Sequence, residues 1–171
     1  MIERLSRLAA HWAVLGGIIL IAIVLVTSLN IALFGADRIA GLWGSDVAGV
    51  SGYEDFVRLA ISSAALMFFP WCQARRGHVA VDLFVEMLPR SVRRALDLLW
   101  LVMSAGLALF LLGWMVAGML ETRTDGVLSP ILGWPEWPFY IPGLISLALW
   151  AAVAAAQAVI DPLAESDHVD I

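Results

Sequence analysis

Four long apolar stretches, each bounded by polar residues, set the predicted architecture of this chain. They run over residues 11–34, 53–72, 96–120 and 139–160, approximately. A bilayer core about 30 Å thick is crossed by roughly 20 apolar residues in helical conformation, so each stretch is long enough for one transmembrane helix. We therefore predict an all-α integral membrane protein in which residues 1–171 form a single membrane domain with four spans.

The segment that joins the second and third stretches shows a different pattern. Residues 79–88 are too polar to cross a membrane, but their apolar positions recur at helical spacing, with acidic positions on another face. The apolar positions are Val81, Phe84, Val85 and Leu88. This pattern is typical of an amphipathic helix that lies in the membrane interface, and Pro89 would end or bend it. We therefore predict a short interfacial helix over residues 79–88.

The composition agrees with lipid as the solvent of this chain. Hydrophobic residues make up 61% of the sequence and charged residues 15%, and the mean hydropathy is +0.89. Soluble domains carry about 25% charged residues, so a soluble fold of this length would lack the polar surface to cover its apolar side chains. The single cysteine, Cys72, excludes an intrachain disulfide and a Cys-x-x-Cys redox pair.

The placement of arginine predicts the orientation of the spans. All ten basic residues are arginines; seven precede the first span or lie between the second and third, and three lie on the other side. The seven are Arg4, Arg7, Arg75, Arg76, Arg90, Arg93 and Arg94, and the three are Arg38, Arg58 and Arg123. Because loops rich in Lys and Arg stay in the cytoplasm, we predict that both termini are cytoplasmic.

Few charged residues lie where they could carry chemistry. Glu54 precedes Arg58 by four residues, an order that favours a salt bridge on a helix, so we predict an ion pair at the outer end of the second span. Four arginines beside the membrane could bind anionic lipid headgroups, at about 1 kcal/mol each, or could serve only to set the topology. These four are Arg75, Arg90, Arg93 and Arg94.

The sequence offers no clear reactive centre. His78 has Asp82 as the one suitably placed second ligand, which disfavours a metal site, and we expect His78 to hydrogen-bond Asp82 or a backbone carbonyl. We find no central carboxylate, no paired membrane histidines, no broken helices and no internal repeats. We therefore predict no catalytic, cofactor or metal site, no enzymatic activity and no nucleic-acid partner. Four plain helices without a site indicate a subunit that supports another protein.

The polar and small residues inside the spans suit helix packing. Asn30, Ser62, Ser63 and Gln157 are suited to hydrogen bonds between helices, and Trp150, near mid-membrane, is expected to pack against another helix. Small residues four positions apart let helices approach closely. They are Ala13 with Gly17, Ala60 with Ala64, and Ala148 with Ala152 and Ala156.

Two motifs carry a family resemblance. The run RRGHVAVDLF over residues 75–84, followed by Leu-Pro-Arg at 88–90, resembles the signature region of the small membrane subunit of TRAP (tripartite ATP-independent periplasmic) transporters, the DctQ-type family. The run LGWPEWPFYIPG over residues 132–143 is similar to the stretch that leads into that family's last span. The motif residues, which are also candidates for the partner interface, are Arg76, Gly77, His78, Val81, Asp82, Pro89, Pro135, Trp137, Tyr140, Pro142 and Gly143.

The resemblance implies a role in transport across the bacterial inner membrane. Members of this family accompany a large permease subunit, which moves the solute, and a periplasmic substrate-binding protein, which delivers it. The resemblance thus implies a small scaffold subunit for the uptake of an organic acid, such as a C4-dicarboxylate, with lipids as further partners. Two alternatives stay open at this point: a self-sufficient small homo-oligomeric transporter, and the small subunit of a tripartite tricarboxylate-type carrier.

Overall fold

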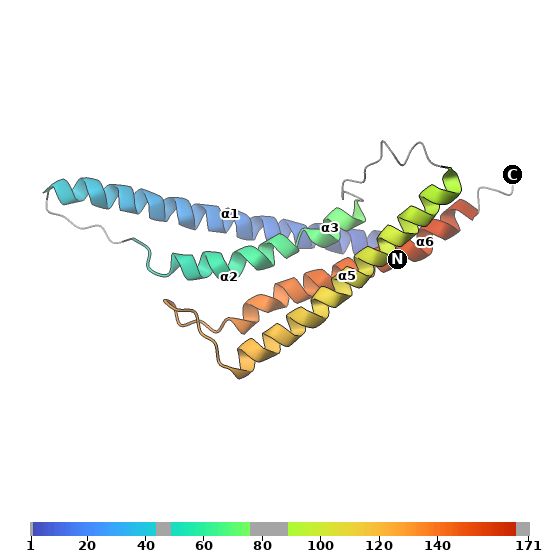
Figure 1. Cartoon of the computed structure of the whole chain (residues 1–171). Helices are drawn as coiled ribbons and strands as arrows, with labels where there is room; N and C mark the ends of the chain where they lie inside the picture. The colour runs from blue at the N-terminus through green and yellow to red at the C-terminus, as the bar shows by residue number, and fades with distance from the viewer. Residues whose placement is uncertain (1, 44–48, 76–88, 167–171) are drawn as a thin grey trace.

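The computed structural model describes residues 2–43, 49–75 and 89–166, and 86% of these residues are helical (Figure 1). The predicted interfacial helix over residues 79–88 lies outside the described residues. The helices are α1 (Ile2–Ala40), α2 (Tyr53–Leu66), α3 (Phe69–Ala74), α5 (Arg90–Thr124) and α6 (Ile141–Ser166), with short 3-10 turns η1 (Gly41–Trp43) and η2 (Trp137–Tyr140). The described residues contain no strand.

Four helical segments are long and apolar enough to cross a membrane, which confirms the predicted fold class. They are Ile2–Ala40, Tyr53–Ala74, Ser91–Thr124 and Trp137–Ile160. The first helix has 39 residues and is therefore about 58 Å long at 1.5 Å per residue. It extends beyond residues 11–34 at both ends, because hydropathy marks only the part of a helix that suits lipid, while backbone hydrogen bonding continues into the polar flanks.

The second span is broken, so the prediction that the chain has no broken helices is wrong. Helix α2 ends at Leu66 and α3 begins at Phe69, with Pro70 in the first turn of α3. Proline has no backbone N–H and clashes with the carbonyl four residues earlier, here that of Leu66, so the helix cannot run straight through. At the break, the N–H groups of Met67 and Phe68 donate to carbonyls of α2 at 3.2–3.3 Å.

The spans form two antiparallel hairpins, α1 with α2–α3 and α5 with α6, which cross at a shallow angle (Figure 1). Helix α6 is central, since it packs against α1, α2, α3 and α5. Half of the most apolar stretch of the fourth span is buried (50%), against 11% for the first span and 17% for the third. Helices α1 and α5 therefore present most of their apolar surface outward.

Buried polar contacts lock the hairpins together near the helix ends that carry most arginines. Gln73 Nε2 donates to Gln157 Oε1 at 2.9 Å, and Gln157 Nε2 donates to the Gln73 carbonyl at 3.2 Å. Trp150 Nε1 donates to Gln73 Oε1 at 3.1 Å, and its ring lies 5.0 Å from that of Phe69. The expectations that Gln157 bonds between helices and that Trp150 packs against another helix are both confirmed.

Candidate partner interface

Helix α5 has one face that no other part of the described chain covers. It packs against α6 and η2 through the side that carries Ala108, Leu112 and Met115. The opposite side exposes large apolar groups, and Trp114 is 68% exposed. We call this side the aromatic face of α5; it consists of Leu99, Met103, Gly106, Phe110, Gly113, Trp114 and Ala117.

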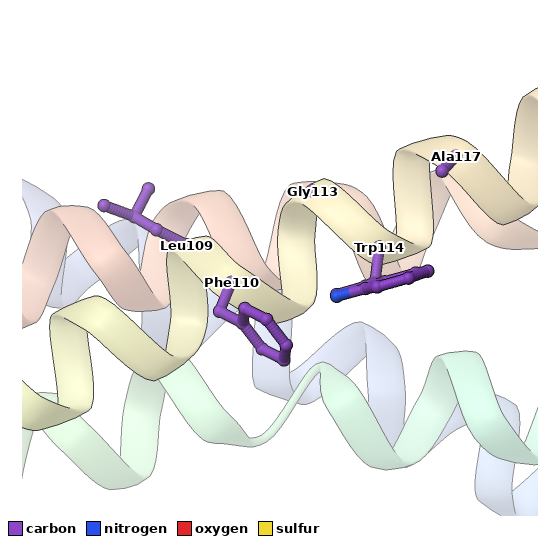
Figure 2. Close-up of a pocket in the computed structure, with 5 residues that line it drawn as sticks. All are labelled: Leu109, Phe110, Gly113, Trp114 and Ala117. Atoms are coloured by element: carbon purple, nitrogen blue, oxygen red, sulfur yellow. The ribbon is translucent and has the colours of Figure 1, made fainter.

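A shallow hollow of about 440 Å³ lies on the aromatic face, lined by Leu109, Phe110, Gly113, Trp114 and Ala117 (Figure 2). Phe110 and Trp114 project from the same side of α5 and meet edge to face, with ring centroids 6.3 Å apart. A Cβ added at Gly113 would meet nothing within 4 Å. Glycine costs a helix about 0.5–1 kcal/mol relative to alanine, and no contact within the described chain requires it at this position.

The exposed surface of α1 differs from the aromatic face. The large side chains that its central part exposes are all aliphatic, namely Val14, Leu15, Ile18, Ile21, Val24 and Leu25. Lipid tails are flexible and can pack against such a surface whatever its shape. Aromatic side chains are instead enriched at the centres of protein interfaces, where they fill or flank pockets in a partner. The aromatic face of α5 is therefore the best candidate for a protein partner, and the α1 surface is the best candidate for lipid.

At the opposite end of the bundle from the Gln73 network, Asp55 ties α2 to the loop between α5 and α6. Asp55 is 4% exposed, and its Oδ2 accepts hydrogen bonds from the backbone N–H groups of Ile131 at 2.8 Å and Leu132 at 2.9 Å. The Ser63 hydroxyl also donates to the carbonyl of Phe139, at the start of the last span. These contacts fix the first three turns of the second span against the loop before the fourth span and the start of that span.

The predicted ion pair between Glu54 and Arg58 is wrong. Arg58 pairs with Glu136, which is 78 residues away in the chain. The side chain of Glu136 is 15% exposed, whereas Glu54 is exposed. An exposed i,i+4 pair is worth only about 0.3–0.5 kcal/mol, so the less hydrated carboxylate that the loop brings to Arg58 is the better partner.

Residues of the second motif, at 132–143, make contacts within the chain. Trp137 packs under the Arg123 guanidinium at 5.1 Å, and the Tyr140 hydroxyl lies 3.4 Å from Thr122 Oγ1. Gly143 lies close against α5, because an added Cβ would lie 2.3 Å from Met115 Cε and the Met115 side chain would have to move. The two prolines make backbone contacts: Pro135 forms an isolated bridge with Leu128, and the Pro142 carbonyl accepts the Ser146 hydroxyl at 2.7 Å.

The first motif lies largely outside the described residues. Arg76, Gly77, His78, Val81 and Asp82 belong to that part, so their partner-interface role stays a prediction. Pro89 is exposed and directly precedes α5, and its carbonyl accepts the N–H groups of Val92 and Arg93 at 3.0 and 3.1 Å.

The lipid candidates lie at helix ends. Arg75 ends α3 and lies over the Trp71 ring at 4.8 Å. Arg90 begins α5, whose first turn contains no acidic residue, and Arg93 and Arg94 are exposed near its start. A helix N-terminus carries partial positive charge, so these arginines gain from a nearby anion.

Sequence reasoning missed both the hollow on α5 and the role of Asp55. Phe110 and Trp114 at i,i+4 beside Gly113 were a usable signal, because this spacing places them on one helix face. Asp55 gave no such signal, since its partners lie 76 and 77 residues further along the chain. Within the described ranges, no group of three His, Cys, Asp or Glu side chains could hold a metal ion.

These features define the class of protein. The chain is a four-span membrane protein whose described residues form buried polar contacts between helices and leave large apolar faces exposed, as expected of a subunit in a larger membrane assembly. The family model of the DctQ component of the tripartite ATP-independent periplasmic transporters matches residues 47–163, which include both motifs. The chain belongs to this family and is thus the small membrane component of a transporter of that kind. No curated protein and no solved structure matches the chain.

Proposed function

We propose that this chain is a scaffold subunit that supports the large permease subunit of its transporter, and that the large subunit docks on the aromatic face of α5. The observation that carries this proposal is the exposed aromatic pair Phe110 and Trp114, which line a shallow hollow together with Leu109, Gly113 and Ala117. A hollow that is flanked by two aromatic rings suits a side chain from a second helix. The side of α5 that carries Ala108, Leu112 and Met115 is already packed on α6 and η2.

Membership of the family supports the wider part of this proposal. The transporter takes up an organic acid, and a periplasmic binding protein delivers the solute to the two membrane subunits. The chain lies in the bacterial inner membrane with both termini in the cytoplasm. The excess of arginine at that side supports this orientation. Residues Gly77, His78 and Asp82 of the first motif are proposed as further partner contacts from the cytoplasmic side.

The docking surface is tested by filling the hollow. Gly113→Leu places a side chain where the partner would insert, and the open space around Gly113 lets the chain itself fold unchanged. Overpacking a well-fitted contact costs about 1–3 kcal/mol, which corresponds to roughly 5- to 150-fold in the dissociation constant. The matched control is Gly35→Leu on α1, where an added Cβ also meets nothing within 4 Å.

Each variant is titrated against the purified large subunit of the same transporter in mild detergent. We expect Gly113→Leu to weaken binding by this factor and Gly35→Leu to bind as the natural chain does. Equal binding by all three proteins would reject α5 as the docking helix. Solute transport by this chain alone in liposomes would reject the scaffold role itself.

A further inference from the structure

The loop between α5 and α6, residues 125–136, has an apolar surface although it connects two spans. Between Asp125 and Glu136 at its two ends, no residue is charged. Leu128 is 58% exposed and Ile131 is 53% exposed. Val127, Pro130, Trp134 and Pro135 are exposed as well. A loop that faced only water would gain nothing from this surface, because exposed apolar area is unfavourable there.

The backbone of the same loop leaves almost no donor for water. Its twelve residues include two prolines, so ten carry an N–H group. Nine of these ten donate to acceptors within the chain, and the exception for which no partner is recorded is Leu128. A water-exposed loop has no need of such pairing, because water accepts these bonds. In a layer depleted of water, each unpaired N–H would cost several kcal/mol.

The loop is also held in one shape by the second span. The Asp55 carboxylate takes the N–H groups of Ile131 and Leu132, and the Leu132 side chain packs over Gly52. A side chain at Gly52 would collide with it, since an added Cβ would lie 2.4 Å from Leu132 Cδ2. Gly52 also has φ +81°, a conformation that favours glycine. The exposed apolar side chains of the loop are thus already held in place, so the loop backbone would lose no further conformational entropy when they contact another surface.

We propose that the α5–α6 loop lies in the interfacial layer of the membrane and anchors this end of the bundle to lipid. Lipid is the occupant because the loop is continuous at both ends with membrane-spanning helices. Its flanks also carry the aromatic and arginine groups that concentrate at that depth: Arg123 lies over Trp137, and Trp134 stacks on Phe139 with ring centroids 6.4 Å apart. A protein surface over the loop is the competing outcome of the test below.

The proposal is tested with a nitroxide label on Ile131→Cys in a Cys72→Ala background, which has no other thiol. The full chain is placed in vesicles of phosphatidylethanolamine and phosphatidylglycerol. Collisions with oxygen, which concentrates in lipid, are compared with collisions with a water-soluble nickel chelate. Labels on Val24→Cys and Glu3→Cys, both exposed positions, give the lipid and aqueous references.

We expect the oxygen-to-nickel ratio at Ile131 to be several-fold above that at Glu3 and closer to that at Val24. A ratio like that at Glu3 would overturn the proposal in favour of a hydrated loop, and low collision with both reagents would overturn it in favour of a protein-covered one. Asp55→Ala removes the acceptor of two N–H groups, so the ratio at Ile131 should then fall toward the aqueous reference. An unchanged ratio would overturn the role of Asp55 in preparing the loop. The experiment uses no partner subunit, so its outcome is independent of the docking proposal.

Discussion

Adjacent glycines on α1 provide a sharp test of how the first two spans meet. A Cβ added at Gly16 would lie 2.9 Å from Met67 Cβ and 3.1 Å from the Ala64 carbonyl oxygen. Met67 lies in the break between α2 and α3 and Ala64 in the last turn of α2, and neither atom can move as the end of a flexible side chain would. Gly16→Ala must therefore push α1 away from the second span. At Gly17 an added Cβ would meet nothing within 4 Å.

The expected magnitude follows from this difference in space. Alanine favours helix over glycine by about 0.5–1 kcal/mol at either position, so that gain cancels when the two variants are compared. Overpacking a close helix contact costs about 1–3 kcal/mol, and it applies to Gly16→Ala alone. We therefore expect the free energy of unfolding of Gly16→Ala to be about 1–3 kcal/mol below that of Gly17→Ala, which should match or exceed that of the natural chain.

The assay is unfolding by sodium dodecyl sulfate in mixed micelles, followed by tryptophan fluorescence. Trp12 and Trp150 report directly, because both donate hydrogen bonds to other helices, to Ser146 at 2.8 Å and to Gln73 at 3.1 Å. If Gly16→Ala proves as stable as Gly17→Ala, then α1 does not approach the break in the second span as described, and the arrangement of the first hairpin is wrong.

Two further predictions concern the other end of the bundle. Gln157→Leu removes both hydrogen bonds to Gln73. Each interhelical hydrogen bond in a membrane contributes about 0.6–1.7 kcal/mol, so the same assay should show a free energy of unfolding about 1–3 kcal/mol lower. An unchanged unfolding midpoint would contradict a stabilising role for the contact between Gln73 and Gln157. Replacing Arg93 and Arg94 by Gln removes two cations, each of which contributes about 1 kcal/mol to binding near an anionic surface. Native mass spectrometry should then show several-fold less retained phosphatidylglycerol. Equal retention would mean that these arginines serve only to set the topology.

The sequence did not identify correctly which face of α1 packs against the other helices. The pair Ala13 and Gly17 indicated a close approach at spacing four, but the buried positions on α1 are Ala9, Ala13, Gly16, Ile23 and Asn30. A contact stripe on a helix alternates steps of three and four residues, so the correct glycine was the neighbouring one. Ala60 and Ala64 were predicted correctly, since both are buried.

In α6 the alanine-rich sequence does not indicate which face of the helix packs against the other helices. Of the predicted stripe, Ala156 is buried but Ala148 and Ala152 are exposed, while Ala151 and Ala154 are buried instead. When almost every position of a segment is alanine, the sequence has no pattern that distinguishes one side of the helix from another. Only the position of the neighbouring helices selects the buried side.

The amino-acid sequence by itself determined the four spans, because the transfer of a side chain from water to lipid is a local property that can be summed along the chain. It also carried the two motifs on which the family resemblance rests. The tertiary structure decided the pairings: Asp55 with the α5–α6 loop, Arg58 with Glu136, and Gln73 with Gln157, which are separated by 76 to 84 residues. It also distinguished the aromatic face of α5 from the lipid-like surface of α1, because apolar side chains look alike in sequence whether they meet lipid, another helix or a partner.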